Sequence, residues 1–202
     1  CRYLNEHFAY AAAGAMLLIT IDGTDRKQVE ADYETVGELC LANGAIEVYV
    51  ADNATTSERV WRIRRNIAEA FKVYSPVQSL EDIVVPFADI PKIIPELERL
   101  AEKYGVVIPC YGHAGDGNLH VTIVKGPDTD MATWEASLGP LLTELYQVAT
   151  RLGGTISGEH GIGHKRKEFL HLAMGPAEIA LMKRIKAAFD PNGILNPGKI
   201  FD

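Results

Sequence analysis

The sequence predicts an α+β domain in which helices cover a mostly antiparallel sheet. Short apolar runs, several of them rich in β-branched residues, alternate along the chain with segments of helical periodicity. Two of these runs are separated only by a stretch rich in Gly, Asp and Asn, residues 112–118, so the chain must turn back there as an antiparallel hairpin. The 202 residues suffice for a substantial core, and we expect residues 1–202 to form one domain.

Each expected strand is a short apolar run that ends near a turn-forming residue. The strands are expected at 15–21, 46–51, 81–86, 106–111 and 119–124, with a short one at 155–156. Each expected helix has apolar residues three or four positions apart, and the helices are expected at 26–42, 57–71, 89–104, 131–152 and 176–189. Ser57 is the expected N-cap of the second helix, and Asn43-Gly44 ends the first.

Composition excludes several classes of protein. The net charge of −7 argues against a general nucleic-acid binder, which needs a basic face. The longest mostly apolar run, residues 8–21, is shorter than the about 20 residues of a membrane helix and lacks the features of a signal peptide. Cys1, Cys40 and Cys110 are too few and too widely spaced for a disulfide framework. We expect a cytoplasmic protein, with peripheral association with a membrane left open.

Three familiar motifs fail on inspection. Residues 193–199 match the first seven positions of a phosphate-binding P-loop, but Ile200 stands where the motif needs Ser or Thr. No G-x-G-x-x-G follows an expected strand, so a Rossmann fold has no support. His160 and His164 have the spacing of a helical metal pair, but two glycines lie between them and Glu159 lies outside the pair.

Four of the six histidines lie in two glycine-rich segments, 111–120 and 153–164. A hairpin that turns at Asp116-Gly117 would bring His113 and His120 together, and the second segment adds Glu159 and His160. Two imidazoles and a carboxylate suit a divalent transition metal with an open position, and a further imidazole suits proton transfer. The alternative is that these glycine-rich turns hold ordinary surface or core histidines.

Glu159 and His160 are adjacent, so on an extended segment their side chains would point to opposite faces. Both can serve one site only if the glycines at 158, 161 and 163 bend the backbone there.

Five segments in this order resemble one family: 60–64 (VWRIR), 81–86 (EDIVVP), 112–120 (GHAGDGNLH), 157–163 (SGEHGIG) and 189–199 (FDPNGILNPGK). They closely resemble the C-terminal substrate domain, or cap domain, of FAD-linked oxidases. The branch concerned contains the glycolate oxidase flavoprotein subunit, D-lactate dehydrogenase and D-2-hydroxyglutarate dehydrogenase, in the vanillyl-alcohol oxidase superfamily. The resemblance covers nearly the whole chain and implies a cap domain related to the ferredoxin-like folds.

The resemblance also implies roles for single residues. It implies His113, His120 and Glu159 as ligands of a divalent metal such as zinc, and His160 as the catalytic base. It implies Arg64 as the clamp on the substrate carboxylate, which a guanidinium matches with two parallel hydrogen bonds. In the tail, Asn196 and Lys199 are expected to approach the flavin. A solvated helix face is the alternative for Arg64, since Arg62 and Arg65 lie beside it.

The implied function is the substrate-binding part of an FAD-dependent oxidoreductase that acts on a small 2-hydroxy acid such as glycolate or D-lactate. Implied partners are the acid, an N-terminal FAD-binding domain, an iron–sulfur or other electron-transfer protein, and further copies of the protein in a homo-oligomer. Because no segment of this chain can bind FAD alone, we expect the chain by itself to be inactive. Two alternatives stay open, a small metallohydrolase and a non-catalytic assembly module.

This chain departs from the pattern of some family members at three positions. Ala68 stands where some have a threonine, Leu80 where some have a lysine, and Thr122 where some have an asparagine. These differences bear on the acid's side chain and leave the identity of the acid open.

Overall fold

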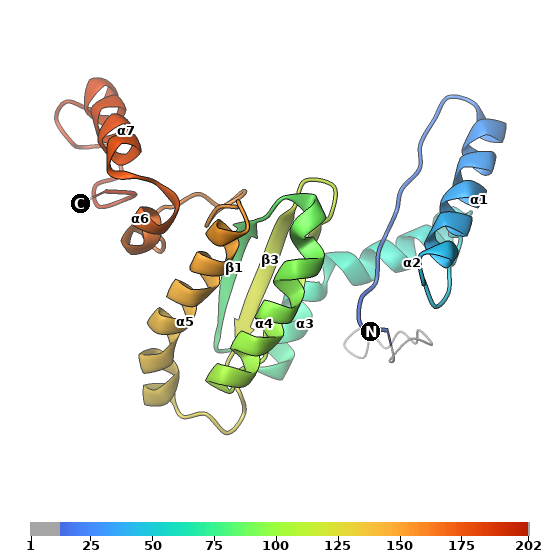
Figure 1. Ribbon diagram of the computed structural model, residues 1–202, viewed down its shortest axis with the longest axis horizontal. Helices are drawn as coiled ribbons and strands as arrows, with labels where there is room; N and C mark the ends of the chain where they lie inside the picture. Colours follow the sequence, from blue (N-terminus) through green and yellow to red (C-terminus); the bar gives the residue numbers. More distant parts are fainter. Residues whose placement is uncertain (1–12, 202) are drawn as a thin grey trace. The chain divides into compact units, whose positions relative to one another are not determined.

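The structure is a computed structural model that describes residues 13–201 (Figure 1). It divides into two compact units, Cys1–Val73 and Tyr74–Asp202, each of which is described by itself. The assignment of residues 1–202 to one cap domain therefore stays a prediction. Cys1 and the first part of the apolar run at 8–21 lie outside the described residues. Within the described residues, no helix is long and apolar enough to span a membrane.

The first unit is helical over most of its described length. Its helices are α1 (Arg26–Ala42) and α2 (Ala54–Arg65), followed by α3 (Ile67–Tyr74), which ends at the division between the units. The side chain of Asp25 caps α1 by accepting a hydrogen bond from the Lys27 amide, 3.0 Å away. Asn53 caps α2 by accepting one from the Thr56 amide at 2.9 Å. The prediction that Ser57 caps this helix was wrong, because Asn53 offers the cap one turn earlier.

The strands predicted at 15–21 and 46–51 do not form: both segments are described by the structure, and neither is a β-strand. Neither segment is part of the described sheet, and most of their apolar side chains are exposed, as the 64% exposure of Leu17 and the 71% exposure of Ile46 illustrate. A β-branched run acquires strand structure only when another strand satisfies its backbone groups, and neither segment has such a partner within the described part of the chain.

The second unit contains the predicted antiparallel sheet, with the strand order β1-β3-β2. The strands are β1 (Gln78–Val84), β2 (Cys110–His113) and β3 (Asn118–Val124). The hairpin predicted from residues 112–118 is confirmed, since β2 and β3 pair with His113 opposite Asn118. The predicted strand at 155–156 is reduced to one bridge between Thr155 and Val84. The α+β fold class is confirmed.

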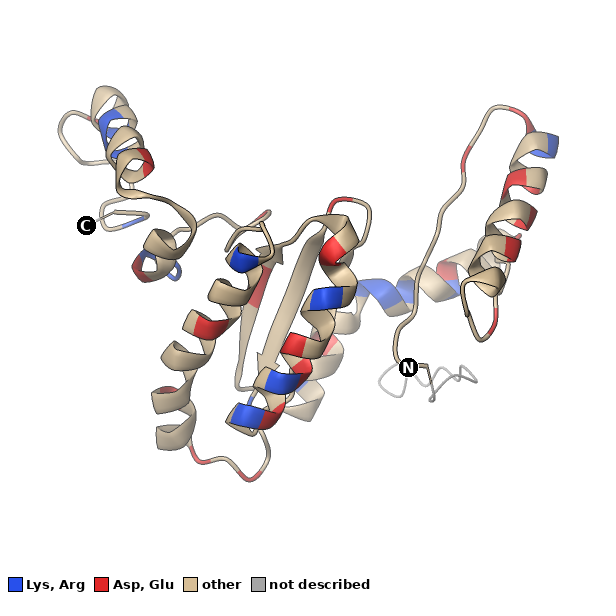
Figure 2. Ribbon diagram, in the orientation of Figure 1, with Lys and Arg blue, Asp and Glu red and all other residues tan. Residues whose placement is uncertain are grey.

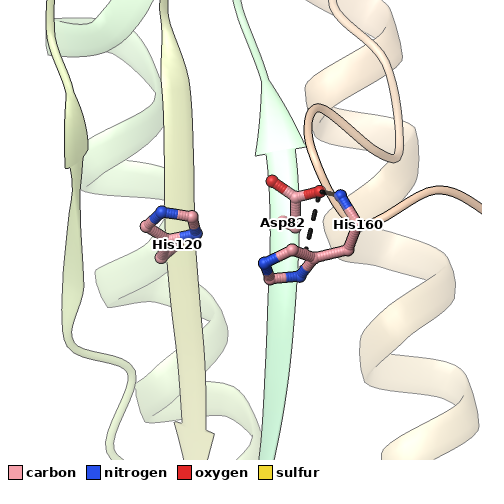
Figure 3. A group of neighbouring side chains, drawn as sticks. All are labelled: Asp82, His120 and His160. Atoms are coloured by element: carbon pink, nitrogen blue, oxygen red, sulfur yellow. Dashed lines mark hydrogen bonds and ion pairs between the residues drawn. The ribbon is translucent and has the colours of Figure 1, made fainter. Parts of the chain in front are cut away.

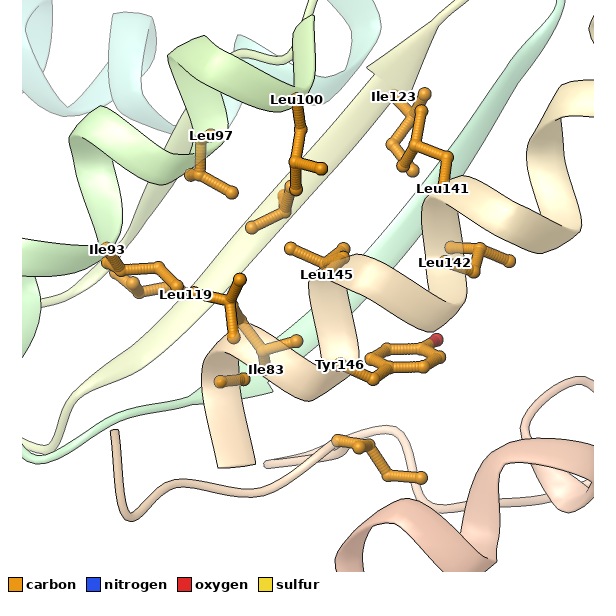
Figure 4. Packing of buried hydrophobic residues seen from close by; sticks show 14 of the residues in the cluster. Ile83, Ile93, Leu97, Leu100, Leu119, Ile123, Leu141, Leu142, Leu145 and Tyr146 are labelled. Atoms are coloured by element: carbon orange, nitrogen blue, oxygen red, sulfur yellow. The ribbon is translucent and has the colours of Figure 1, made fainter. Parts of the chain in front are cut away.

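The remaining helices are α4 (Ile90–Tyr104), α5 (Met131–Arg151), α6 (Leu170–Ala173) and α7 (Pro176–Phe189), with short 3₁₀ turns at Phe87–Asp89 and Lys167–Phe169. Three of these helices match predicted ones within one residue at each end, whereas α6 and the two 3₁₀ turns were not predicted. Helices α4 and α5 pack together across one face of the sheet (Figure 1). Alternate residues of β1 and β3 point to this face and form a core with the two helices, including Ile83, Leu119, Ile123, Leu97 and Leu145 (Figure 4).

The opposite face of the sheet has a different chemistry. The register of β1 and β3 places Asp82 directly opposite His120, and Tyr111 of β2 pairs with His120 on its other side. Since paired residues project from the same face, these polar side chains share the face that α4 and α5 do not cover. The sheet therefore separates an apolar core from a polar surface that carries the candidate site.

Candidate functional site

The first part of the site is the β2–β3 hairpin. Gly117 lies in its turn with a φ of +77°, and its amide donates a hydrogen bond to the His113 carbonyl at 3.1 Å. A Cβ atom on Gly117 would lie 1.8 Å from the carbonyl oxygen of Val85, so only glycine fits this turn. The ring centroids of His113 and His120 are 6.1 Å apart. The prediction that the turn brings these two histidines together is confirmed.

The second part of the site is the glycine-rich segment 157–164. A Cβ atom on Gly158 would lie 2.0 Å from the side-chain nitrogen of Asn118, so the absence of a side chain lets this segment approach β3. Gly161 and Gly163 have φ values of +73° and +55°, in the left-handed region that glycine enters without strain. The glycines thus bend the segment as the sequence suggested.

The bend brings both Glu159 and His160 to the hairpin histidines. A Glu159 carboxylate oxygen lies 3.9 Å from Nε2 of His113. The His160 ring stacks on the ring of His120, with centroids 5.6 Å apart and an angle of 15° between the planes. Two adjacent residues therefore contribute to one group of side chains.

Two sets of three side chains in this region lie close enough together to hold a metal ion. The potential ligand atoms of His113, His120 and Glu159, here called the His–Glu cluster, lie within 4.8 Å of one another. The same criterion is met by Asp82, His120 and His160 (Figure 3). Both offer nitrogen and carboxylate oxygen donors, which suit zinc and similar divalent ions.

The hydrogen bonds of Asp82 distinguish the two sets. One carboxylate oxygen of this buried side chain accepts the amides of residues 158–160 and the hydroxyl of Ser157, and the other accepts the Asn118 amide group. Burial by itself would raise the pKa of Asp82, but the hydrogen bonds from the His160 and Glu159 amides and from Asn118 outweigh it and lower the pKa to about 2. The oxygen that lies 3.9 Å from His160 is the one that already accepts four hydrogen bonds, which makes it a poor metal ligand, so the donor chemistry favours the His–Glu cluster.

Sequence reasoning did not identify Asp82 or its neighbour Glu81 as part of this region. Both carboxylates are fully buried on β1, within the run at 81–86 that was predicted to be a strand. Two consecutive acidic residues in a buried strand are the signal that was available, because a buried charge requires dedicated partners.

Arg64 belongs to the first unit, whereas the His–Glu cluster belongs to the second. Basic residues gather in the last turn of α2 and include Arg62, Arg64 and Arg65 (Figure 2). The role of Arg64 as a carboxylate clamp stays a prediction.

Asn196 and Lys199 line a cavity of about 460 Å³ between α7 and the tail that follows it. Apolar side chains, among them Ile185 and Phe189, form much of its wall. The backbone amide of Ile200, next to Lys199, donates a hydrogen bond of 2.7 Å to the carbonyl of Gly163. The tail is therefore attached to the segment that contains Glu159 and His160.

The departures at Leu80 and Thr122 lie beside the site. These two residues are cross-strand partners and lie two residues along each strand from the pair Asp82 and His120, on the same face of the sheet. Leu80 is 38% exposed, and Thr122 is buried with a hydroxyl that has no hydrogen-bond partner among the described residues.

Comparison with known proteins identifies the family. Residues 4–200 match the model of the family described as FAD linked oxidases, C-terminal domain. The chain is 37% identical over 187 residues to a D-lactate dehydrogenase of Anaerostipes hadrus, an alignment that covers 93% of this chain and 39% of the relative. It is 37% identical over 193 residues to the glycolate oxidase subunit GlcD of Bacillus subtilis, covering 94% of this chain and 40% of the relative.

A third relative is a D-2-hydroxyglutarate dehydrogenase of Stutzerimonas stutzeri, 30% identical over 187 residues, with 91% of this chain and 40% of the relative covered. The chain thus spans about two fifths of the length of these curated relatives. Since the family model covers nearly all of the sequence, the chain belongs to the family of C-terminal domains of FAD-linked oxidases.

Proposed function

We propose that this chain is the substrate-binding domain of an FAD-dependent oxidoreductase that converts a small 2-hydroxy acid into the 2-oxo acid. Lactate, glycolate and 2-hydroxyglutarate, which appear in the names of the relatives, all have a hydroxyl group next to a carboxylate. The observation that carries the proposal is the His–Glu cluster with His160 stacked beside it. These side chains suit the hydroxyl group that all three acids share.

In this proposal, His113, His120 and Glu159 hold a divalent metal such as zinc, which their two nitrogens and one carboxylate oxygen fit. When bound, such an ion polarises the substrate hydroxyl and lowers its pKa. Glu159 and His113 are about half exposed, so the cluster leaves room for a substrate oxygen.

His160 accepts the proton of the substrate hydroxyl in this scheme. Its Nδ1 lies 3.9 Å from the buried carboxylate of Asp82. When bound, FAD would supply the redox chemistry as the acceptor of the α-hydrogen of the substrate. Asn196 and Lys199 contribute to the flavin environment from the tail, and an FAD-binding domain of the same protein provides the rest of that site.

The residues beside the cluster favour a small acid. Leu80 and Thr122 carry no charge, and they occupy neighbouring positions on the face that contains His120. A second carboxylate on the substrate would require a compensating cation, whereas glycolate and D-lactate have none to accommodate. We therefore infer the glycolate or D-lactate class of substrate.

The test is anaerobic reduction of the flavin in the full-length protein. We expect D-lactate or glycolate to bleach the flavin absorbance, and the 202-residue chain with added FAD to show no such reaction. Hydrolytic turnover by the chain alone would instead support a metallohydrolase. Failure of every small 2-hydroxy acid to reduce the flavin of the full-length protein would overturn the proposal.

For Arg64, the proposed role is recognition of the substrate carboxylate. Arg64→Lys replaces the planar fork with a point charge, so the full-length enzyme should lose about 2 kcal/mol of transition-state binding, roughly 30-fold in kcat/KM, mainly through a higher KM. Arg65→Lys is the matched control, because Arg65 pairs with Glu58 on an exposed surface of the same helix. Equal effects of the two substitutions on KM would assign Arg64 to the solvated face of α2.

A further inference from the structure

The buried carboxylate of Asp82 accepts hydrogen bonds from several donors at once. One of its oxygens accepts hydrogen bonds from three consecutive backbone amides, those of Gly158 at 3.0 Å, Glu159 at 2.9 Å and His160 at 2.8 Å. The same oxygen accepts the hydroxyl of Ser157 at 3.2 Å. The Asp82 side chain itself is fully buried, so its carboxylate depends on these donors rather than on water.

Three successive amides can converge on one oxygen only when the backbone between them adopts a narrow range of φ and ψ values. These hydrogen bonds therefore tie the conformation of residues 158–160 to Asp82. Among the described residues, one backbone–backbone hydrogen bond also joins this stretch to β1, from the Gly158 amide to the Asp82 carbonyl at 3.3 Å. Hydrogen bonds to a charged acceptor are about twice as strong as those between neutral groups, so the bonds to the Asp82 carboxylate are the stronger connection.

The backbone conformation of this stretch decides where two side chains go. Glu159 extends toward His113, 3.9 Å away, while the ring of His160 lies parallel to the ring of His120. Neighbouring residues of an extended segment would point in opposite directions, so both contacts depend on the bend that the three amides adopt around Asp82.

We propose that Asp82 is the positioning residue of the site: it holds residues 158–160 in the conformation that turns Glu159 toward His113 and His120 and keeps His160 beside them. This inference rests on the proposed metal site. Asp82 acts through the backbone, since the oxygen nearest His160 is fully occupied by its four donors.

Two substitutions of Asp82 test this role by removing different numbers of hydrogen-bond acceptors. Asp82→Ala removes both side-chain acceptors and leaves the amides of Glu159 and His160 without this partner, while the Gly158 amide keeps only its weaker bond to the main-chain carbonyl of residue 82. Asp82→Asn retains one oxygen that can face the amides. Ile123→Val is the control, because it removes one methylene from the core face of β3 and lowers stability without touching residues 158–160.

In the full-length protein, we expect Asp82→Ala to weaken zinc binding by about 10- to 100-fold, the usual effect of losing a group that orients a metal ligand, as measured by competition with a chromophoric chelator. Backbone amides in peptides that contain residues 157–160 should exchange hydrogen faster. Asp82→Asn should give an intermediate result in both measurements, and Ile123→Val should change neither.

A folded Asp82→Ala or Asp82→Asn protein with unchanged zinc affinity and unchanged exchange would overturn the role of Asp82 and leave the metal site standing. A loss of zinc affinity in Ile123→Val equal to that in the Asp82 variants would also overturn it, since general destabilisation would then explain the effect. If the unmodified protein binds no zinc, the proposed metal site fails, and the positioning role fails with it.

Discussion

His160→Ala in the full-length protein is expected to lower kcat by about 10²–10⁴-fold while the metal content stays that of the unmodified protein. The magnitude is the usual effect of removing a positioned general base. The metal should remain because the three members of the His–Glu cluster are untouched, and the backbone amide of His160 can still bind Asp82 in the alanine variant.

Glu159→Gln should behave differently, although the two residues are adjacent. Glutamine keeps the shape of glutamate and loses the charge that makes its oxygen a good metal ligand, so metal and activity should be lost together. Metal analysis of the two purified variants, together with single-turnover flavin reduction, separates proton transfer from metal ligation.

His171→Ala is the control for both variants, since His171 is an exposed histidine on α6 and we expect no change in kcat or metal content. A metal-free His160→Ala protein beside a metal-replete Glu159→Gln protein would reverse the two roles. Full activity of His160→Ala would remove this residue from the proposed mechanism.

The elements that the sequence predicted correctly are those with local causes. The hairpin at 112–118 depends on a turn in which Gly117 has a positive φ, and α5 and α7 depend on apolar periodicity within one segment. The segments at 15–21 and 46–51 have the composition of strands, but pairing depends on another part of the chain, and composition gives no information about that.

The same distinction applies to the site. His113 and His120 could be paired from sequence because one turn joins them. Asp82 could not be connected to Gly158 or His160, because 76 and 78 residues separate it from them and only the folded sheet brings them together. The Glu-Asp pair in an apolar strand indicated that buried partners were needed, without indicating which residues they were.

Glu81, which projects from the opposite face of β1 to Asp82, provides the second large expected effect. It is fully buried, and its two oxygens accept hydrogen bonds from Ser79 and Lys165, each at 2.6 Å, and from the Tyr146 hydroxyl, also at 2.6 Å. The guanidinium of Arg166, 5% exposed, lies 3.5 Å away. Burial and the Glu81 charge both raise the pKa of Tyr146, so Tyr146 remains a donor to this carboxylate.

Glu81→Ala should lower the free energy of unfolding by about 3–5 kcal/mol, because it leaves the Arg166 cation buried without its partner. The double variant Glu81→Ala/Arg166→Ala should lose less stability than the sum of the losses in the two single variants, since the second substitution removes the unpaired charge.

Urea unfolding followed by tryptophan fluorescence measures the stability of all three variants. Glu30→Ala is the control, because it breaks an exposed pair with Arg26 and should change stability little. A loss below about 1 kcal/mol for Glu81→Ala, or strict additivity in the double variant, would show that the buried carboxylate contributes no more than an ordinary surface group.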